Sequence, residues 1–209
     1  MKPDIIIFPD GSLKQGDKRS YAGYGSVILD PERKQYTILN GSLNSNSIVY
    51  CEGWAVYKSF VELERYRKMK GIPFLKVLVV SDSKLTVQTF SEWIKYAWDL
   101  TDWYDWKKGD GQSVKNQDLY RRILKIMNNE HYKVKFVHIN SHSNNKRSSI
   151  EKIRMKLQFA KIRLDDRTLK TFIEMNRLAD EAATSITSAN KEADTKPNRW
   201  IHLIRRKDN

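Results

Sequence analysis

The first apolar segment of the chain ends in a carboxylate, and this feature restricts the fold more than any other. Residues 5–8 are three isoleucines and a phenylalanine, and Pro9, Asp10, Gly11 and Ser12 follow them. A short, continuous apolar run is typical of a strand that is buried on both faces. Asp10 then lies where the strand leaves the core, and Gly11 permits a sharp bend beside it. A carboxylate in this position is well placed for chemistry.

Pro9 adds a constraint to the same segment. Proline has no N–H group, so it cannot donate to the hydrogen-bond ladder of a central strand. We therefore predict that the regular ladder breaks at Pro9, through a bulge or because the strand runs past the end of its neighbour.

Three further acidic residues stand out by position. Residues 75–81 form a second apolar strand, which ends at Asp82. If the two apolar strands are parallel neighbours, their carboxyl ends lie side by side at the edge where open α/β folds place their sites. Glu52 falls in the first turn of a long helix, and Asp180 falls in the first turns of the last helix.

The order of expected elements predicts an α/β fold with a five-stranded mixed sheet, three antiparallel strands followed by two parallel ones, and helices on its faces. A chain of 209 residues suits one well-buried domain with additions. Strands are expected at 4–10, 21–29, 34–41, 75–81 and 132–140. Helices are expected at 50–70, 83–93, 116–130 and 176–188, with a helical segment at 148–174 in which Asp165 and Asp166 mark a break or cap.

The composition of the chain limits the classes of partner and the kinds of site that it can have. The chain has 38 Lys and Arg against 25 Asp and Glu, a formal net charge of +13. This excess favours a polyanionic partner, either nucleic acid or an acidic membrane surface. Cys51 is the sole cysteine, which excludes an intrachain disulfide and a cysteine zinc site. No segment approaches the roughly 18 apolar residues of a membrane span, so we expect a soluble, cytoplasmic protein with no membrane partner.

A cluster of the four carboxylates would need cations. Like charges repel, so gathering Asp10, Glu52, Asp82 and Asp180 costs free energy unless a cation neutralises them. Oxygen ligands without cysteine select Mg²⁺ or Mn²⁺. Two such ions could clamp a phosphodiester, activating the attacking water and stabilising the leaving oxygen. The competing interpretation is that each acid is simply solvated surface, as most of the 25 must be.

The motifs together resemble type 1 ribonuclease H. The segment 8–12 is similar to the first acidic motif of that family, 51–55 to its helix-borne glutamate, 81–83 to its third acidic motif and 176–183 to its last. The segment 23–28 resembles its second strand, 114–120 the start of the helix after its basic protrusion, and 141–142 its loop histidine. The resemblance covers roughly residues 4–143 and 175–189.

The resemblance implies a metal-dependent endonuclease that cuts the RNA strand of RNA–DNA hybrids and leaves 3′-hydroxyl and 5′-phosphate ends. It implies that Asp10, Glu52, Asp82 and Asp180 hold two Mg²⁺ ions, with Mn²⁺ as a substitute, and that His142 shuttles a proton or helps product leave. We further expect a monomer that binds the hybrid through an additional set of residues: Gly11, Ser12, Ser47, Trp103, Trp106, Lys107, Lys108, Lys115 and Asn176.

Three departures from the family pattern concern substrate binding. Ile48, Val49 and Tyr50 stand where the family often has Asn-Asn-Arg, so contacts from those polar groups must come from elsewhere. We expect residues 1–190 to form the catalytic domain, with a basic helical insertion at about 145–174. This insertion is either a packed helical hairpin or an arm that binds the hybrid. Residues 191–209 form a basic tail, in which 197–204 could bind a protein partner.

The segment 94–115 interleaves tryptophans with lysines and corresponds to the basic protrusion of the family. Rings can pack on sugars while cations offset phosphates, and we expect this role for Trp103 and Trp106. Helix-spaced tryptophans can equally belong to the core, which is the interpretation we favour for Trp93.

Two other functions remain open from the sequence. A nuclease of the same fold, such as a junction resolvase, would reuse the carboxylates without the protrusion. A non-catalytic hybrid-binding module would have no need to retain all four acids.

Overall fold

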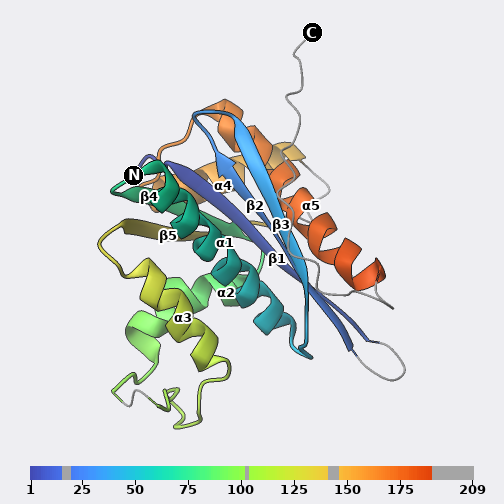
Figure 1. Cartoon of the computed structure of the whole chain (residues 1–209). Helices are drawn as coiled ribbons and strands as arrows, with labels where there is room; N and C mark the ends of the chain where they lie inside the picture. The colour runs from blue at the N-terminus through green and yellow to red at the C-terminus, as the bar shows by residue number, and fades with distance from the viewer. Residues whose placement is uncertain (16–19, 102–103, 141–145, 190–209) are drawn as a thin grey trace.

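The computed structural model describes residues 1–15, 20–101, 104–140 and 146–189 (Figure 1). A single sheet has the strand order β3-β2-β1-β4-β5. Its strands are β1 (Ile5–Gln15), β2 (Ser20–Asp30), β3 (Gln35–Leu43), β4 (Leu75–Ser81) and β5 (Tyr132–His138). The first three strands pair antiparallel, and β1–β4 and β4–β5 are parallel. The predicted fold class is confirmed.

Helices cover both faces of the sheet (Figure 1). One layer holds α1 (Ile48–Lys70), α2 (Lys84–Gln88), the π-helix η1 (Thr89–Ala97) and α3 (Gln117–Met127). The other holds α4 (Lys146–Phe159) and α5 (Asp166–Ala189). Within the described ranges, none of these helices is both long and apolar enough to cross a membrane.

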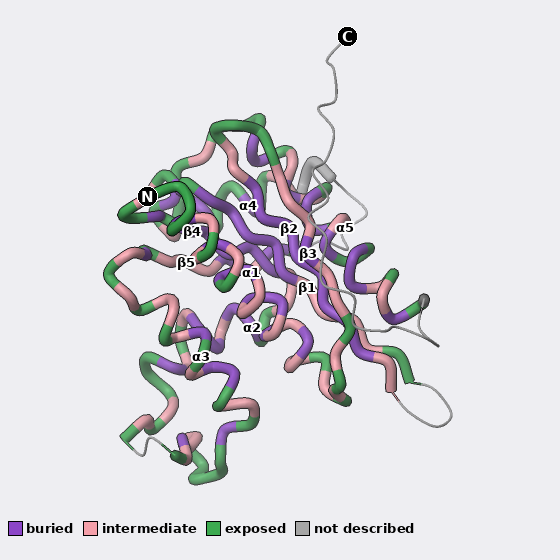
Figure 2. Tube along the Cα trace, viewed as in Figure 1, coloured by how far each residue is buried: buried purple, intermediate pink, exposed green. Residues whose placement is uncertain are grey.

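The alternation of side chains along β1 supplies both layers of core. Ile5 and Ile7 pack with the α1 side, whereas Ile6 and Phe8 pack with α4 and α5. Phe8 meets Phe172 of α5 edge to face, with ring centroids 5.1 Å apart. All four β1 residues are almost fully buried, and Figure 2 shows the central strands as a continuous buried band. The strand is therefore buried on both faces, as its apolar run predicts.

β1 runs past the end of its parallel neighbour, as Pro9 predicts. β1 pairs with β4 only from Ile5 to Ile7, but its pairing with β2 continues without a break to Gln15. Pro9 lies beyond the β4 ladder, so its missing N–H group interrupts nothing on that side. The strand is longer than the predicted 4–10 because pairing with β2 alone sustains its second half.

A buried ion pair ties α1 to the far edge of the sheet. Glu64 accepts hydrogen bonds from the Arg67 guanidinium at 2.8 and 2.9 Å and from the Tyr132 hydroxyl at 2.6 Å. Arg67 is buried and also donates to the carbonyl of Ile72, just beyond the helix. The bonds from Arg67 hold the pKa of Glu64 at about 2, well below its usual value. This carboxylate is a structural one.

The end of the chain differs from the prediction. Asp165 caps α5 by accepting from the Thr168 N–H at 2.7 Å, so the expected break or cap at 165–166 is correct. However, α5 then continues as one helix to Ala189. The expected separate helix at 176–188 is its second half, and Asp180 lies in mid-helix rather than in the first turns. Residues 166–174 thus belong to the helix that carries Asp180.

The described part of the predicted insertion is packed on the sheet. Ile153 and Leu157 of α4, and Ile162 after it, are almost fully buried against Val137 and Ile139. The other α4 residues from Glu151 onward are exposed. The apolar side of α4 is therefore packed on the domain, as the first of the two interpretations of the insertion predicts. Its other side presents cationic residues to solvent.

Candidate metal centre

All four predicted carboxylates line one open cavity of about 470 Å³. They arrive from four separate elements: Asp10 from β1, Glu52 from α1, Asp82 from the end of β4 and Asp180 from α5. The remaining lining residues are Gly11, Ser83, Ile173, Asn176 and Arg177. The cavity lies at the carboxyl end of β4. Asp10 lies in the middle of β1 rather than at the predicted strand end, where β1 runs past the end of β4.

Asp10 is half-buried in the middle of β1. Its Oδ1 accepts the N–H of Gly11 at 2.8 Å. Burial, and then the negative charge of Asp82, raise the pKa of Asp10 to about 8 despite that hydrogen bond, with smaller contributions from Asp180 and Glu52. Desolvation and like charge both disfavour the ionised carboxyl. The fold thus brings Asp10 close to three other acids, and their negative charge adds to the effect of burial on its pKa.

Two glycines let helices approach Asp10 from both faces. A Cβ atom on Gly11 would lie 2.7 Å from the backbone nitrogen of Glu52. Gly25 pairs with Asp10 across the β1–β2 ladder, and a Cβ there would lie 2.2 Å from the carbonyl oxygen of Ala179. Contacts this short exclude a side chain at either glycine. Because glycine has no Cβ atom, α1 and α5 can approach the sheet closely enough for Glu52 and Asp180 to reach the cavity.

Two hydroxyl groups orient Glu52. Its Oε2 accepts from Ser83 Oγ at 2.5 Å and from Thr86 Oγ1 at 2.8 Å. Burial raises the pKa of Glu52, and these two hydrogen bonds oppose the shift. Ser83 also caps α2, where its Oγ accepts the Thr86 N–H at 3.2 Å. The sequence analysis missed Thr86; its place three residues after a capping serine was the available signal.

Asp82 is held through both its side chain and its backbone. Asn176 of α5 donates from Nδ2 to Asp82 Oδ2 at 3.1 Å, and His138 Nε2 lies 3.1 Å from the Asp82 carbonyl oxygen. Asn176 is only 2% exposed, so it supports Asp82 rather than presenting itself to substrate as expected. Asp180 is exposed, and Thr184 Oγ1 donates to its Oδ1 at 3.3 Å.

These residues fit a hard divalent cation in their donor chemistry. Among the described residues, no three acidic, histidine or cysteine side chains converge as a ready-made metal cage. The four carboxylates nevertheless face one cavity, and the buried Asn176 Oδ1 has no hydrogen-bond partner within the described chain. Oxygen donors of this kind suit Mg²⁺ or Mn²⁺. The predicted catalytic His142 lies outside the described residues.

Two residues that were predicted to contact substrate form hydrogen bonds within the protein instead. Ser12 Oγ lies 2.9 Å from Thr187 Oγ1 of α5. Ser47 caps α1, where its Oγ accepts from the Tyr50 N–H at 3.3 Å. The Ser12 hydroxyl therefore links β1 to α5, and the Ser47 hydroxyl caps the start of α1.

The protrusion differs from the expectation at Trp106. The indole is 3% exposed, and the Arg121 guanidinium lies over its ring at 4.7 Å. The backbone N–H of Trp106 donates to Gln117 Oε1 at 2.8 Å. The structure therefore contradicts the prediction that the Trp106 ring contacts substrate directly, because Arg121 of α3 covers the ring. Trp103 lies outside the described residues.

The lysines of the protrusion remain closer to solvent. Lys107 contacts Asp105 and donates to Ser113 Oγ at 3.2 Å. Lys108 is half-buried and Lys115 is exposed. Lys95, Lys108 and Lys115 are thus the cations of this segment for which the described chain shows no ion pair with a carboxylate.

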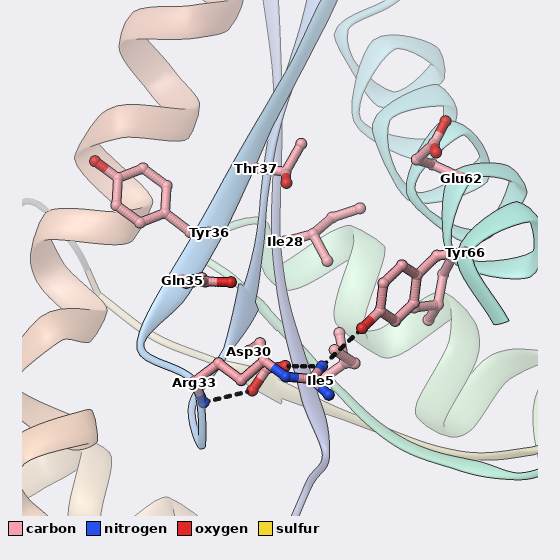
Figure 3. Close-up of a pocket in the computed structure, with 10 residues that line it drawn as sticks. Ile5, Ile28, Asp30, Arg33, Gln35, Tyr36, Thr37, Glu62 and Tyr66 are labelled. Carbon is pink, nitrogen blue, oxygen red and sulfur yellow. Dashed lines mark hydrogen bonds and ion pairs between the residues drawn. The ribbon is translucent and has the colours of Figure 1, made fainter. Parts of the chain in front are cut away.

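A second, smaller hollow of about 110 Å³ lies at the end of the sheet where β1 begins (Figure 3). Ile5, Ile28 and Leu63 are among its apolar lining residues. At its rim, Arg33 pairs with Asp30 at 3.1 Å and donates to the Tyr66 hydroxyl at 2.8 Å (Figure 3). Here an internal cation neutralises the acid, so this hollow is not a second candidate metal site.

The mixed sheet, its two helical layers and the carboxylates at its central strands define an α/β protein of the ribonuclease H-like class. A model of the RNase H family matches residues 2–151, and the chain belongs to this family. Asp10, Glu52 and Asp82 fall inside the matched range, whereas Asp180 lies beyond it.

Relatives and solved structures agree with this assignment. Proteins named Ribonuclease H from two strains of Tropheryma whipplei, Twist and TW08/27, are each 31% identical over 67 residues. Those residues make up 32% of this chain and 38% of either relative. The match thus spans well under half the length of these relatives.

Two solved structures share the fold. LC9-RNase H1, described as a type 1 RNase H with the type 2 active-site motif, gives a TM-score of 0.51 at 15% identity, over 74% of this chain and 70% of that one. A foamy viral protease-reverse transcriptase in complex with RNA/DNA hybrid gives a TM-score of 0.59 at 15% identity, over 89% of this chain and 20% of that one.

Proposed function

We propose that this protein is a metal-dependent endonuclease that hydrolyses the RNA strand of RNA–DNA hybrids and leaves 3′-hydroxyl and 5′-phosphate ends. The observation that carries the proposal is the single cavity lined by Asp10, Glu52, Asp82 and Asp180, in which burial and the neighbouring acids raise the pKa of Asp10 to about 8. Family membership and the relatives named Ribonuclease H support this activity. A relative of the same fold has been solved with an RNA/DNA hybrid.

Each carboxylate would have a defined part in this reaction. Two divalent ions, when bound, supply an activated water and stabilise the leaving oxygen. Asp10, Glu52, Asp82 and Asp180, which line the same cavity, would hold these ions. Ser83 and Thr86 fix the Glu52 carboxylate, and Asn176 fixes that of Asp82. These hydrogen bonds limit the motion of the carboxylate ligands. The ligands would therefore need to move little during the reaction.

Substrate binding would use the excess positive charge. Lys108 and Lys115 on the protrusion would contact phosphates beside the cavity. His142 would assist proton transfer or product release, and the chain would act as a monomer. The segment 197–204 would bind a protein partner.

The first experiment compares four substrates. The protein is given labelled RNA–DNA hybrid, double-stranded RNA, double-stranded DNA and a four-way junction, each with Mg²⁺, with Mn²⁺ and without divalent ions. We expect cleavage of the hybrid alone, only with a divalent ion, and products with the stated ends. Cleavage of the junction with the hybrid left intact would instead identify a resolvase.

The second experiment replaces one ligand. Asp82→Asn removes a negative charge but keeps an oxygen that can accept from Asn176. We expect Mg²⁺-dependent cleavage to fall by about 10³-fold or more, because removal of a group that stabilises transition-state charge has effects of this size. Hybrid binding should survive. Asp30→Asn, at the neutralised acid of the second hollow, is the matched control and should cleave normally.

A further inference from the structure

β5 carries exposed positive charge along the free edge of the sheet. Lys133 and Lys135 are alternate residues of this edge strand, so both side chains point to the same face of the sheet. Lysines on an edge strand are a common device against pairing with another sheet. In this protein, however, the positive charge continues beyond the strand.

α4 and the turn after it extend this surface. Lys152 and Lys156 lie one helical turn apart and are both exposed. Lys161 and Arg163, in the turn between α4 and α5, are exposed as well. We call this set the β5-edge track, and its members are Lys133, Lys135, Lys152, Lys156, Lys161 and Arg163.

Carbonyl oxygens rather than carboxylates hold two of these ammonium groups. Lys135 Nζ donates to the carbonyl of Ala160, and Lys156 Nζ donates to that of His138 at 3.0 Å. A carbonyl positions an ammonium group without cancelling its charge. The two cations are thus oriented in advance, which lowers the entropic cost of binding an anion.

The track is electrostatically uncompensated within the described chain. None of its six side chains forms an ion pair with a carboxylate that the structure describes. Desolvation and the nearby Lys152 lower the pKa of Lys156. Such repulsion destabilises the free protein slightly, and a bound polyanion would relieve it.

The track begins at the candidate metal centre. Lys156 Nζ lies 3.3 Å from His138 Nδ1, and the other ring nitrogen of His138 contacts the Asp82 carbonyl. From His138 back to Lys133, β5 covers about 17 Å at about 3.3 Å per residue. The positive charge therefore extends away from the candidate metal centre along this edge of the sheet.

An exposed aromatic ring lies within the same surface. Phe159, at the end of α4 between Lys156 and Lys161, is 93% exposed. An aromatic ring among cations is the arrangement that binds single strands, because bases stack on the ring while the cations follow the backbone. Paired bases of a duplex have no free face to offer it.

We propose that the β5-edge track binds a single-stranded extension of the nucleic-acid substrate, with one base stacked on Phe159. The assignment of the substrate rests on the proposed function. The track lies on the α4 side of the sheet, whereas the protrusion lies on the α1 side. It thus provides a second direction in which nucleic acid can leave the cavity.

Binding measurements test the proposal without cleavage. The full chain carrying Asp82→Asn, in Mg²⁺ buffer, is titrated with a blunt hybrid and with the same hybrid bearing a single-stranded tail. We expect the tail to strengthen binding about tenfold or more. Adding Lys133→Glu and Lys152→Glu should abolish that gain and lower the salt slope of tail binding by about 1.4, at about 0.7 per phosphate contact. Affinity for the blunt hybrid should be unchanged.

Matched controls separate the track from bulk charge. Lys70→Glu with Lys125→Glu makes the same change in net charge on exposed residues of the α1 layer, and should leave the tail effect intact. Phe159→Ala should reduce tail binding about 5-fold or more while keeping its salt slope. Melting curves confirm that each variant is folded, and Lys→Gln versions at the same positions repeat the test without charge reversal.

Several outcomes would overturn the proposal. These are a tail that adds no affinity, equal losses for blunt and tailed hybrids, and binding of anionic lipid vesicles that only the track variants lose. The last would identify the track as a membrane-surface site. The test is independent of catalysis, because a protein that cleaves no hybrid can still bind the tail, and an active one can fail to bind it.

Discussion

The carboxylate cavity and the second half of α1 hold acids of the same kind in opposite electrostatic states. Asp10 has its pKa raised to about 8 because it is buried among other acids. Glu64 has its pKa lowered to about 2 because Arg67 and Tyr132 donate to it. An acid that the chain neutralises itself supports the fold. An acid that the chain leaves uncompensated is available to an ion from outside.

The largest effect on stability should come from the contact that brings Asp180 towards Asp10. Gly25→Ala would place a Cβ atom 2.2 Å from the Ala179 carbonyl oxygen, and backbone must move to accommodate it. We expect a loss of about 3 kcal/mol in the free energy of unfolding, together with weaker Mg²⁺ binding. Urea titration measures the first effect and calorimetry the second.

Gly109→Ala is the matched control, because nothing lies within 4 Å of a Cβ atom at Gly109. Its stability should change by less than about 0.5 kcal/mol. If Gly25→Ala were equally harmless, the close approach of α5 to β2 would not be what positions Asp180.

An intermediate effect is expected from the neutralised acid. Glu64→Gln removes the charge that compensates the buried Arg67 and should cost about 1–3 kcal/mol. The pKa of Glu64 is lower in the folded protein than in the unfolded chain. Its contribution is therefore fully present above about pH 4.5 and is lost as the pH falls towards 2. Thermal melts of both proteins at several pH values measure this difference.

Hybrid cleavage by folded Glu64→Gln should equal that of the parent, since this acid lies outside the cavity. Glu62→Gln breaks only a surface pair with the exposed Arg65 and should cost less than about 0.5 kcal/mol. If Glu64→Gln lost activity without losing stability, Glu64 would not be a structural acid, and its contrast with the cavity acids would be wrong.

The smallest effect has the opposite sign. Asp10→Asn should stabilise the metal-free protein by about 1 kcal/mol near pH 8, which is about 2–4 °C in Tm. The pKa of Asp10 is raised on folding, so the folded state holds a proton that the unfolded chain releases, and stability declines as pH rises from about 4 to 8. The variant lacks this decline while abolishing cleavage.

Melts at pH 5 and pH 8 without divalent ions test the sign. Adding Mg²⁺ should then stabilise the parent and leave Asp10→Asn nearly unchanged, because only the parent retains the full ligand set. A metal-free variant less stable than the parent at pH 8 would show that the acids of the cavity are compensated after all.

Strong local patterns made much of the fold predictable. The strand at 75–81 is found at the predicted bounds, because an unbroken apolar run between turn signals has few alternatives. Pro9 correctly indicated where β1 leaves its parallel neighbour. Another feature became visible only in the structure: α5 comes very close to the sheet at Gly23 and Gly25 of β2.

The misses depend on contacts between residues far apart in sequence. Trp106 beside two lysines looks like a ligand for nucleic acid, and only the stacking of Arg121 shows that it is buried. The switch from α2 to a π-helix at Thr89 leaves no periodic signal that differs from an ordinary helix. Residues 166–174 looked like an insertion because the family pattern resumes only after them.

The single helix α5 extends far beyond the segment that lies beside the site. It has 24 residues and is about 36 Å long. Its tightest contact with the sheet is Ala179 over Gly25, one residue from Asp180. Asp166, at the N-terminal end of this helix, lies about 21 Å from Asp180 along the helix axis. The sequence of α4 joins α5 at that end, away from Asp180.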